Sequence, residues 1–348
     1  MTQKGIKRRS FLGAGFLGLG ALAGWFGSKK WLGPKASEPP KAKGVASAKP
    51  AVDLSEFQQI DHASLLYEYD HSFSTQLLQT KRFSKGENGS VWVCGDKRVL
   101  QFDKTGKLMW SKDLQDTPHA VVSYDQNVII AYKDALEALN MEGAQLWRKG
   151  PLEGKTYFTA LAAYEGNLYA ADAGQRNIVV CQLSDQKLSR FGDKDEAKGN
   201  PGFVVPSGYF DMKITDQGLF HIANPGRLRV ETWSFDGMFQ GSWGQAGMAL
   251  GRFCGCCNPV FFDVFPNGSF VTSEKGLSRV CIFNPDGSLK GMAMSSDELV
   301  QDPVKMKQAR NQNAAGVGFD VLVQEDGSLL ICDPVMNEIR TFVPKRNA

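Results

Sequence analysis

The feature of this sequence that most constrains its fold is a pattern that recurs six times after residue 80. Each copy has a turn containing Asn, Asp or Gly, a short apolar strand, a second strand and a further turn. The copies are 38, 39, 52, 50 and 59 residues apart, counted from one residue in each: Gly89, Asn127, Gly166, Gly218, Gly268 and Gly327. A repeat near 40 residues with four strands per unit is typical of propeller blades. The sequence therefore predicts an all-β fold, a six-bladed β-propeller.

The two ends of the repeat region predict how the ring closes. Most copies continue into a fourth, outer strand, as residues 107–110 do, but the sixth copy has none after residues 340–343. Residues 65–69 form an apolar strand that precedes the first blade and has no blade of its own. We expect this N-terminal strand to become the outer strand of the last blade, because the pairing satisfies two free edges.

Residues 1–30 have the pattern of an export signal. A basic stretch ending in Arg8 and Arg9 precedes a Gly- and Ala-rich apolar run that starts with Phe11 and Leu12. This arrangement resembles a twin-arginine signal, which implies transport of a folded protein across the bacterial inner membrane. The alternative is an ordinary signal or anchor that follows a chance Arg pair. We expect an exported, periplasmic protein whose signal segment is either cleaved or retained as an anchor in the inner membrane.

Charge and composition set the remaining boundaries. Residues 31–56 are rich in Pro, Ala and Lys without periodicity, which predicts a flexible linker before a propeller over residues 57–345. Residues 1–50 contain ten Lys or Arg and one Glu, so the other 298 residues contain 30 Lys or Arg against 36 Asp or Glu. The folded part is mildly acidic, which argues against nucleic acid or an anionic membrane as its main ligand.

One blade carries a family resemblance. Gly251, Arg252 and Phe253 precede Pro259, an apolar strand, the 267–268 Asn-Gly turn and the strand 279–283. This order resembles an NHL repeat, and blades 3 to 6 follow it loosely, whereas blades 1 and 2 resemble quinoprotein-type repeats. The resemblance implies the propeller fold. It leaves open whether the protein is an enzyme, because propellers host enzymes, sensors and scaffolds alike.

The most unusual string is Cys254-Gly255-Cys256-Cys257, in the predicted loop between the outer strand of blade 4 and the inner strand of blade 5. That loop belongs at the funnel end of the propeller. Thiolates bind soft metals and iron–sulfur clusters, and the twin-arginine route accepts proteins folded around a cofactor. With residues 271–276, the string resembles exported NHL-type proteins suspected of iron–sulfur binding.

Three uses of these cysteines follow. In the first, the loop is a functional site: a metal or an iron–sulfur centre binds to Cys254, Cys256 and Cys257, or these thiols carry out redox chemistry. The protein would then belong to a periplasmic redox or enzyme assembly with another periplasmic or membrane protein. Alternatively, a disulfide between two of them locks the loop of a non-catalytic binding or scaffold propeller. An inert loop is the third possibility.

No other residue completes the cysteine site clearly. Cys94, Cys181 and Cys332 are predicted to pack in the core and Cys281 to lie on a blade face, so Asn258, water or an external ligand would take a fourth position. Glu274 and Lys275 either lie near the loop or form a solvated turn.

Aspartates repeat at matching positions in the inner strands of blades 4, 5 and 6, at Asp211, Asp263 and Asp320. They either bind a hard cation such as calcium or accept backbone hydrogen bonds between blades, and the second interpretation is favoured. His119 and His221 are too few for a zinc-lyase site and are expected in the core or funnel. Residues 295–314 predict a short helix over one face. Phosphate-binding, serine-hydrolase and zinc-protease motifs are absent from the sequence.

Overall fold

The structure, a computed structural model, describes residues 60–313 and 316–346. The chain divides into two units, Met1–Ala51 and Val52–Ala348, and all described residues belong to the second. The expected export signal with Arg8, Arg9, Phe11 and Leu12 lies outside the described residues, as does the predicted linker. Within the described ranges, no helix is both long enough and apolar enough to span a bilayer.

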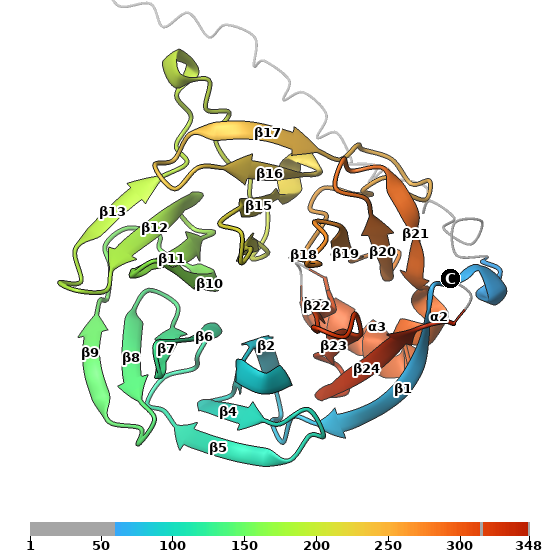
Figure 1. The fold of residues 1–348 in the computed structure, drawn as a ribbon, viewed down its shortest axis with the longest axis horizontal. Helices are drawn as coiled ribbons and strands as arrows, with labels where there is room; N and C mark the ends of the chain where they lie inside the picture. The colour runs from blue at the N-terminus through green and yellow to red at the C-terminus, as the bar shows by residue number, and fades with distance from the viewer. Residues whose placement is uncertain (1–59, 314–315, 347–348) are drawn as a thin grey trace, which may run out of the picture. The chain divides into compact units, whose positions relative to one another are not determined.

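The described domain is a ring of six antiparallel sheets, each with four strands (Figure 1). Blade 1 contains β2 (Thr80–Lys85), β3 (Val91–Gly95), β4 (Arg98–Phe102) and β5 (Leu108–Asp113). Blade 2 contains β6 (Ala120–Tyr124), β7 (Asn127–Ala131), β8 (Leu136–Asn140) and β9 (Gln145–Lys149). Blade 3 contains β10 (Phe158–Tyr164), β11 (Asn167–Asp172), β12 (Asn177–Gln182) and β13 (Leu188–Phe191). The predicted six-bladed β-propeller is confirmed.

The second half of the ring follows the same order until its last blade. Blade 4 contains β14 (Met212–Ile214), β15 (Phe220–Asn224), β16 (Arg229–Trp233) and β17 (Phe239–Trp243). Blade 5 contains β18 (Phe261–Val264), β19 (Phe270–Glu274), β20 (Arg279–Phe283) and β21 (Leu289–Met294). Blade 6 contains β22 (Asp320–Val323), β23 (Leu329–Asp333), β24 (Glu338–Pro344) and β1 (Tyr67–Ser74).

The N-terminal strand closes the ring, as the unpaired ends of the repeat predicted. β1 pairs antiparallel with β24, from Tyr67 opposite Pro344 to Ser74 opposite Glu338. The strand begins two residues later and runs further than residues 65–69, because a bulge between Tyr69 and His71 lets it follow the whole length of β24.

The burial of the strands explains the repeating pattern. The second strand of blade 1, β3, is buried along its whole length, whereas the outer strand β5 alternates between half-buried and exposed residues. The Asp-Gly turns also serve the packing between blades. Gly287 adopts φ +80°, and a Cβ there would lie 2.5 Å from the Trp243 Cβ of the neighbouring blade. Glycine is therefore required both by the turn and by the close approach.

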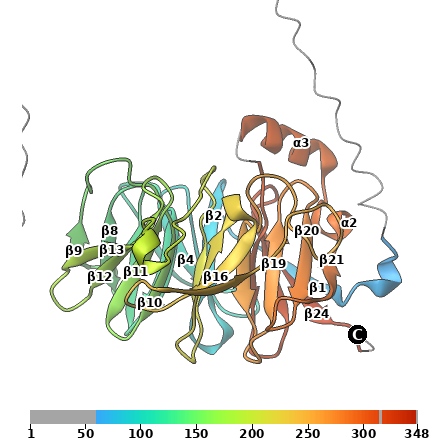
Figure 2. The same cartoon turned by 90° about the horizontal axis from the view of Figure 1, so that it is seen from above.

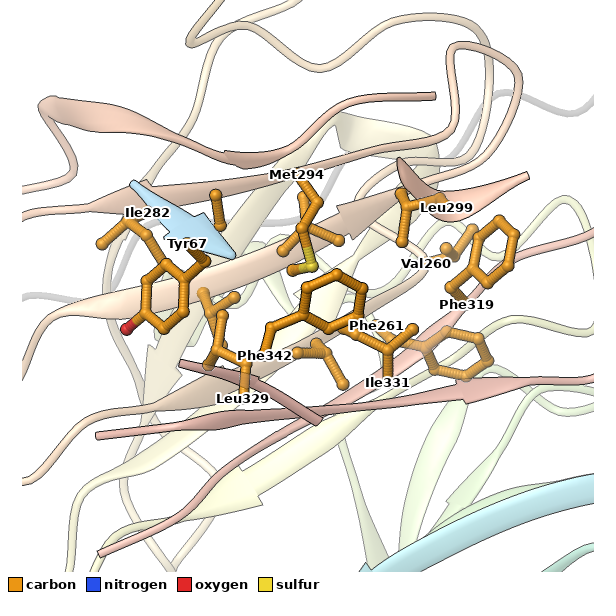
Figure 3. Close-up of a cluster of buried hydrophobic side chains, with 14 of the residues drawn as sticks. Tyr67, Val260, Phe261, Ile282, Met294, Leu299, Phe319, Leu329, Ile331 and Phe342 are labelled. Atoms are coloured by element: carbon orange, nitrogen blue, oxygen red, sulfur yellow. The ribbon is translucent and has the colours of Figure 1, made fainter. Parts of the chain in front are cut away.

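The core consists of apolar layers between neighbouring blades. Figure 3 shows the layer between blades 5 and 6, in which Ile282 of β20 and Ile331 of β23 belong to one buried cluster. Tyr67 of β1 and Phe342 of β24 belong to the same cluster, so the closing pair is part of the core. Burial of this apolar surface is the main force that holds the blades together.

Two helices, α2 (Ser296–Leu299) and α3 (Pro303–Gln312), occur where a single helix was predicted. A capping box of Ser295 and Glu298 begins α2, and the Asp302 side chain begins α3 by accepting from two backbone N–H groups. Figure 2 shows α3 on one face of the ring. Single-turn 3-10 helices occur at η1 (His62–Ser64), η2 (Glu87–Gly89), η3 (Glu196–Lys198) and η4 (Pro225–Arg227).

Candidate functional site

The cysteine loop lies where the repeat placed it, between β17 of blade 4 and β18 of blade 5. The buried side chain of Asn258 holds it in position. Its amide nitrogen donates to the carbonyl oxygens of Cys254, at 2.7 Å, and Lys275, at 3.2 Å. Its amide oxygen accepts from the Lys275 backbone nitrogen at 3.0 Å. Asn258 therefore fastens the loop to the segment that follows β19 instead of serving as a solvent-facing ligand.

A buried ion pair supports the start of the loop. Glu274 accepts a hydrogen bond from the backbone nitrogen of Cys254 at 3.1 Å, and its other oxygen lies 2.7 Å from Nε of Arg279. The Arg279 guanidinium also donates to the carbonyls of Met248, at 3.1 Å, and Arg252, at 2.6 Å. Glu274 and Lys275 thus lie at the loop, the first through its carboxylate and the second through its backbone.

Cys256 and Cys257 form a close and asymmetric pair. Their sulfur atoms lie 3.2 Å apart, Cys256 is exposed and Cys257 is buried. Burial alone raises the pKa of Cys257, but the Ser207 hydroxyl and the Lys275 ammonium outweigh it, so the pKa lies below its usual value. The hydrogen bond and charge of Cys257 raise the pKa of Cys256. At neutral pH the buried sulfur is therefore the more readily ionised of the two.

Cys254 has different neighbours. Its sulfur lies 3.6 Å from the Asn258 amide nitrogen and 4.0 Å from the Lys275 carbonyl oxygen. Burial and the nearby Glu274 carboxylate raise its pKa. In residues 60–313 and 316–346, no three His, Cys, Asp or Glu side chains are grouped so that they could hold a metal ion. The three cysteines of the loop, as placed, do not form a common ligand set.

The repeated aspartates are paired with cations that belong to the protein. Arg82 of β2 places Nη2 2.7 Å from Asp211 and Nε 2.9 Å from Asp320, and both carboxylates are buried. Lys85 of the same strand lies 3.2 Å from Asp263. Arg82 and Lys85 thus come from blade 1 to meet carboxylates of blades 4, 5 and 6.

The same aspartates accept backbone hydrogen bonds. Asp211 accepts from Phe262 of the next blade at 3.2 Å, and Asp263 accepts from Val323 of the next blade at 2.8 Å. Asp320 differs because its partner is Val321 of its own strand, at 2.9 Å. Burial raises the pKa of Asp320 to about 6, although Arg82 acts in the opposite direction.

Sequence reasoning missed Arg82. The sequence did contain a signal for it. The innermost strand of blade 1, β2, has three basic residues, Lys81, Arg82 and Lys85, among its six. The strand register places Asp320 opposite Cys332 but Asp263 opposite Val271, so the three aspartates do not share one position as predicted. Buried acidic side chains nevertheless need compensating charge. A search for basic residues at the same position of other blades would have found it.

A cavity of about 730 Å³ opens at the face that carries α3. Its walls include His119, Tyr157 and Tyr209, each just before or at the start of an inner strand, and Arg82 and Asp320 line it too. The hydroxyl of Tyr209 donates to Gly316 at 2.9 Å, and Lys275 lies over its ring at 4.9 Å from the centroid. Tyr209 therefore touches the cavity on one side and the cysteine-loop support on the other.

The two histidines have separate positions. His119 lines the cavity and donates from Nδ1 to the Phe158 carbonyl at 3.1 Å. Its ring is tilted by 54° against that of Tyr157, with ring centroids 4.9 Å apart. His221 is buried in β15 between Thr232 and Phe270. Burial lowers the pKa of both, that of His221 to about 4, so both rings are neutral at pH 7.

Comparison with known proteins identifies the architecture. No protein-family model and no curated protein sequence matches the chain. Among solved structures, a streptogramin B lyase has a TM-score of 0.52 at 9% identity, with 82% of this chain and 100% of that chain covered. The WD40 β-propeller domain of Doa1 has a TM-score of 0.53 at 11% identity, with 81% and 98% covered. The fold defines this domain as a six-bladed β-propeller, and at these identities the likeness shows the fold alone.

Proposed function

We propose that this protein is an exported, NHL-type propeller whose Cys256–Cys257 pair carries out thiol–disulfide exchange. The observation that supports the proposal is the asymmetry of the pair, with sulfur atoms 3.2 Å apart, one exposed and one buried beside Lys275. An accessible sulfur can be attacked by a partner, and a buried sulfur with a lowered pKa is a good leaving group.

The exchange proceeds in two balanced steps. In the oxidised form a disulfide joins Cys256 and Cys257, and a partner thiolate attacks Sγ of Cys256. The S–S bond breaks, and its electron pair leaves with Sγ of Cys257. A second partner thiol loses its proton and attacks the mixed disulfide, which releases Cys256. Two electrons and two protons pass to the protein, and the partner keeps a disulfide. The reverse sequence reduces a partner disulfide.

The partner is a periplasmic or membrane protein that presents a dithiol or disulfide. Disulfides persist in the periplasm, where such exchange partners occur. The export step rests on the resemblance of residues 8–12 to a twin-arginine signal. Replacing both Arg8 and Arg9 by Lys is expected to leave the protein in the cytoplasm, as measured by cell fractionation. Unchanged periplasmic delivery would contradict this route.

A redox titration tests the proposed chemistry. The protein is equilibrated with mixtures of reduced and oxidised dithiothreitol, and the Cys256–Cys257 disulfide is measured by alkylation and mass spectrometry. We expect a reversible two-electron transition above about −300 mV. Cys256→Ser abolishes it, whereas Cys254→Ser, the matched control in the same loop, retains it.

The other uses of the loop give different results in the same samples. A disulfide that stays oxidised below about −300 mV supports the non-catalytic binding or scaffold propeller with a structural loop lock. Iron, copper or zinc at stoichiometric content after purification without oxygen, lost in Cys256→Ser, supports a metal or iron–sulfur centre. Either outcome overturns thiol–disulfide exchange as the function of this loop.

A further inference from the structure

The funnel cavity has the size of a site for a small organic molecule. Its volume of about 730 Å³ lies within the range of about 300–1,000 Å³ that is usual for such sites. Helix α3 contributes Lys305 and Gln312 to one wall, and the inner ends of the blades contribute the rest. The thiol chemistry proposed above uses none of these residues.

The exposed charged side chains among the described lining residues are basic. Arg82 and Asp320 are buried at the inner end, and Arg82 pairs with both Asp320 and Asp211. Lys81 and Lys305, in contrast, are exposed. Among the described residues Lys81 has no ion pair, and Lys305 has only a 3.8 Å contact with Asp302 of its own helix. The lining therefore has two exposed ammonium groups without a partner from another segment, whereas the charges of Arg82 and Asp320 at the inner end offset each other.

The walls between these charges are aromatic. Tyr157 is 39% exposed and lies tilted against the ring of His119, and Tyr209 packs edge-on against Phe261 with ring centroids 5.3 Å apart. The Nδ1 of His119 donates to a carbonyl, so its neutral ring leaves Nε2 as a hydrogen-bond acceptor. Flat apolar surfaces with a few fixed polar groups favour a planar ligand over a flexible chain.

We propose that the funnel binds a small aromatic anion, with its planar body between the aromatic walls and its anionic group near Lys81 and Lys305. The exposed ammonium groups set the orientation, because at the inner end the charge of Asp320 is offset by Arg82, whose Nε lies 2.9 Å away. The ligand class is thus an aryl carboxylate or a similar aryl anion that fits within the cavity.

Binding of 2-naphthoate, measured by calorimetry on the purified protein, tests the proposal, with the neutral 2-naphthalenemethanol as its matched analogue. We expect saturable binding of the carboxylate and at least about fivefold weaker binding of the alcohol. We expect Lys81→Gln and Lys305→Gln each to weaken binding of the carboxylate by about three- to tenfold and to leave binding of the alcohol unchanged. Lys307→Gln, an exposed substitution on the same helix outside the cavity lining, changes neither.

Several results would overturn the proposal. They are the absence of saturable binding, equal affinity for carboxylate and alcohol, or an equal loss in Lys307→Gln and Lys81→Gln. All three variants replace exposed side chains, so unfolding does not confuse the comparison, and circular dichroism checks it. Cys256→Ser is expected to bind 2-naphthoate as the parent does, so failure of the thiol proposal and failure of this one are distinguishable.

Discussion

The four cysteines in strands and the three in the loop share one domain but differ in chemistry. Cys94, Cys181, Cys281 and Cys332 are buried in β3, β12, β20 and β23. Burial raises the pKa of Cys94 to about 12 and that of Cys181 to about 11. The pKa of Cys257 is lowered although it is also buried. Burial alone therefore does not decide reactivity, and a nearby cation with a polar neighbour can reverse its effect.

The largest expected effect comes from removing the support of the loop. Glu274→Ala leaves the buried Arg279 unpaired, and we expect it to lower the free energy of unfolding by about 3–5 kcal/mol in urea denaturation. The matched control is Asp333→Ala, which removes the buried acidic partner of Arg340 in another blade and leaves its 3.7 Å contact with Glu338. Both variants should lose stability, but only Glu274→Ala should change the alkylation rate of Cys257. An equal change in both would mean that the pair has no specific role at the loop.

Alkylation of the native protein compares the two groups of cysteines directly. We expect iodoacetamide at pH 7.5 to modify the Cys256–Cys257 pair at least about 100-fold faster than the strand cysteines, because those thiols are buried and protonated. Mass spectrometry of the digested protein gives each rate, and alkylation in denaturant gives the reference for all seven. Comparable native rates for Cys94 and Cys256 would contradict the distinction.

Serine substitution distinguishes packing from chemistry. Cys94→Ser places a hydroxyl in an apolar layer, and we expect a loss of about 1–3 kcal/mol in the free energy of unfolding. Cys256→Ser changes an exposed side chain and should remain within about 0.5 kcal/mol of the parent while it abolishes redox exchange. A large stability loss in Cys256→Ser would indicate a structural role for that thiol.

The smallest effect concerns the cation beside Cys257. Lys275→Gln removes a positive charge that lowers the pKa of Cys257, so its pKa should rise and less thiolate should be present at pH 7. We expect the alkylation rate of the pair to fall several-fold, and its pH profile to move to higher pH. Lys307→Gln is the control for loss of one surface charge, and equal pH profiles for the two variants would contradict the role of Lys275.

The fold could be predicted because its information is local. Each hairpin has its own turn residues, and the absent outer strand of the last copy was apparent from counting. The position of the cysteine loop followed from the same alignment. These inferences required only the order of strands along the chain.

The site could be predicted less well because its contacts cross the ring. Arg82 and Asp211 are 129 residues apart, and nothing in the spacing shows that the two meet. Asn258 acts through hydrogen bonds to the backbone of Lys275. Which of the three cysteines pair depends on the local backbone path of residues 254–258, which brings Cys256 and Cys257 together and leaves Cys254 apart. The aspartates could be found because they recur in several blades. Their basic partners, Arg82 and Lys85, occur on the single strand β2 and belong to no repeated pattern.

The pairing of β1 with β24 also has a consequence for how the chain is made. His71 and Thr341, in the two paired strands, are 270 residues apart. During synthesis the first five blades precede β24, so until that strand emerges β1 has no partner and the ring stays open. A chain cut short before β24 cannot close. Ring closure thus requires two strands from opposite ends of the domain, β1 and β24.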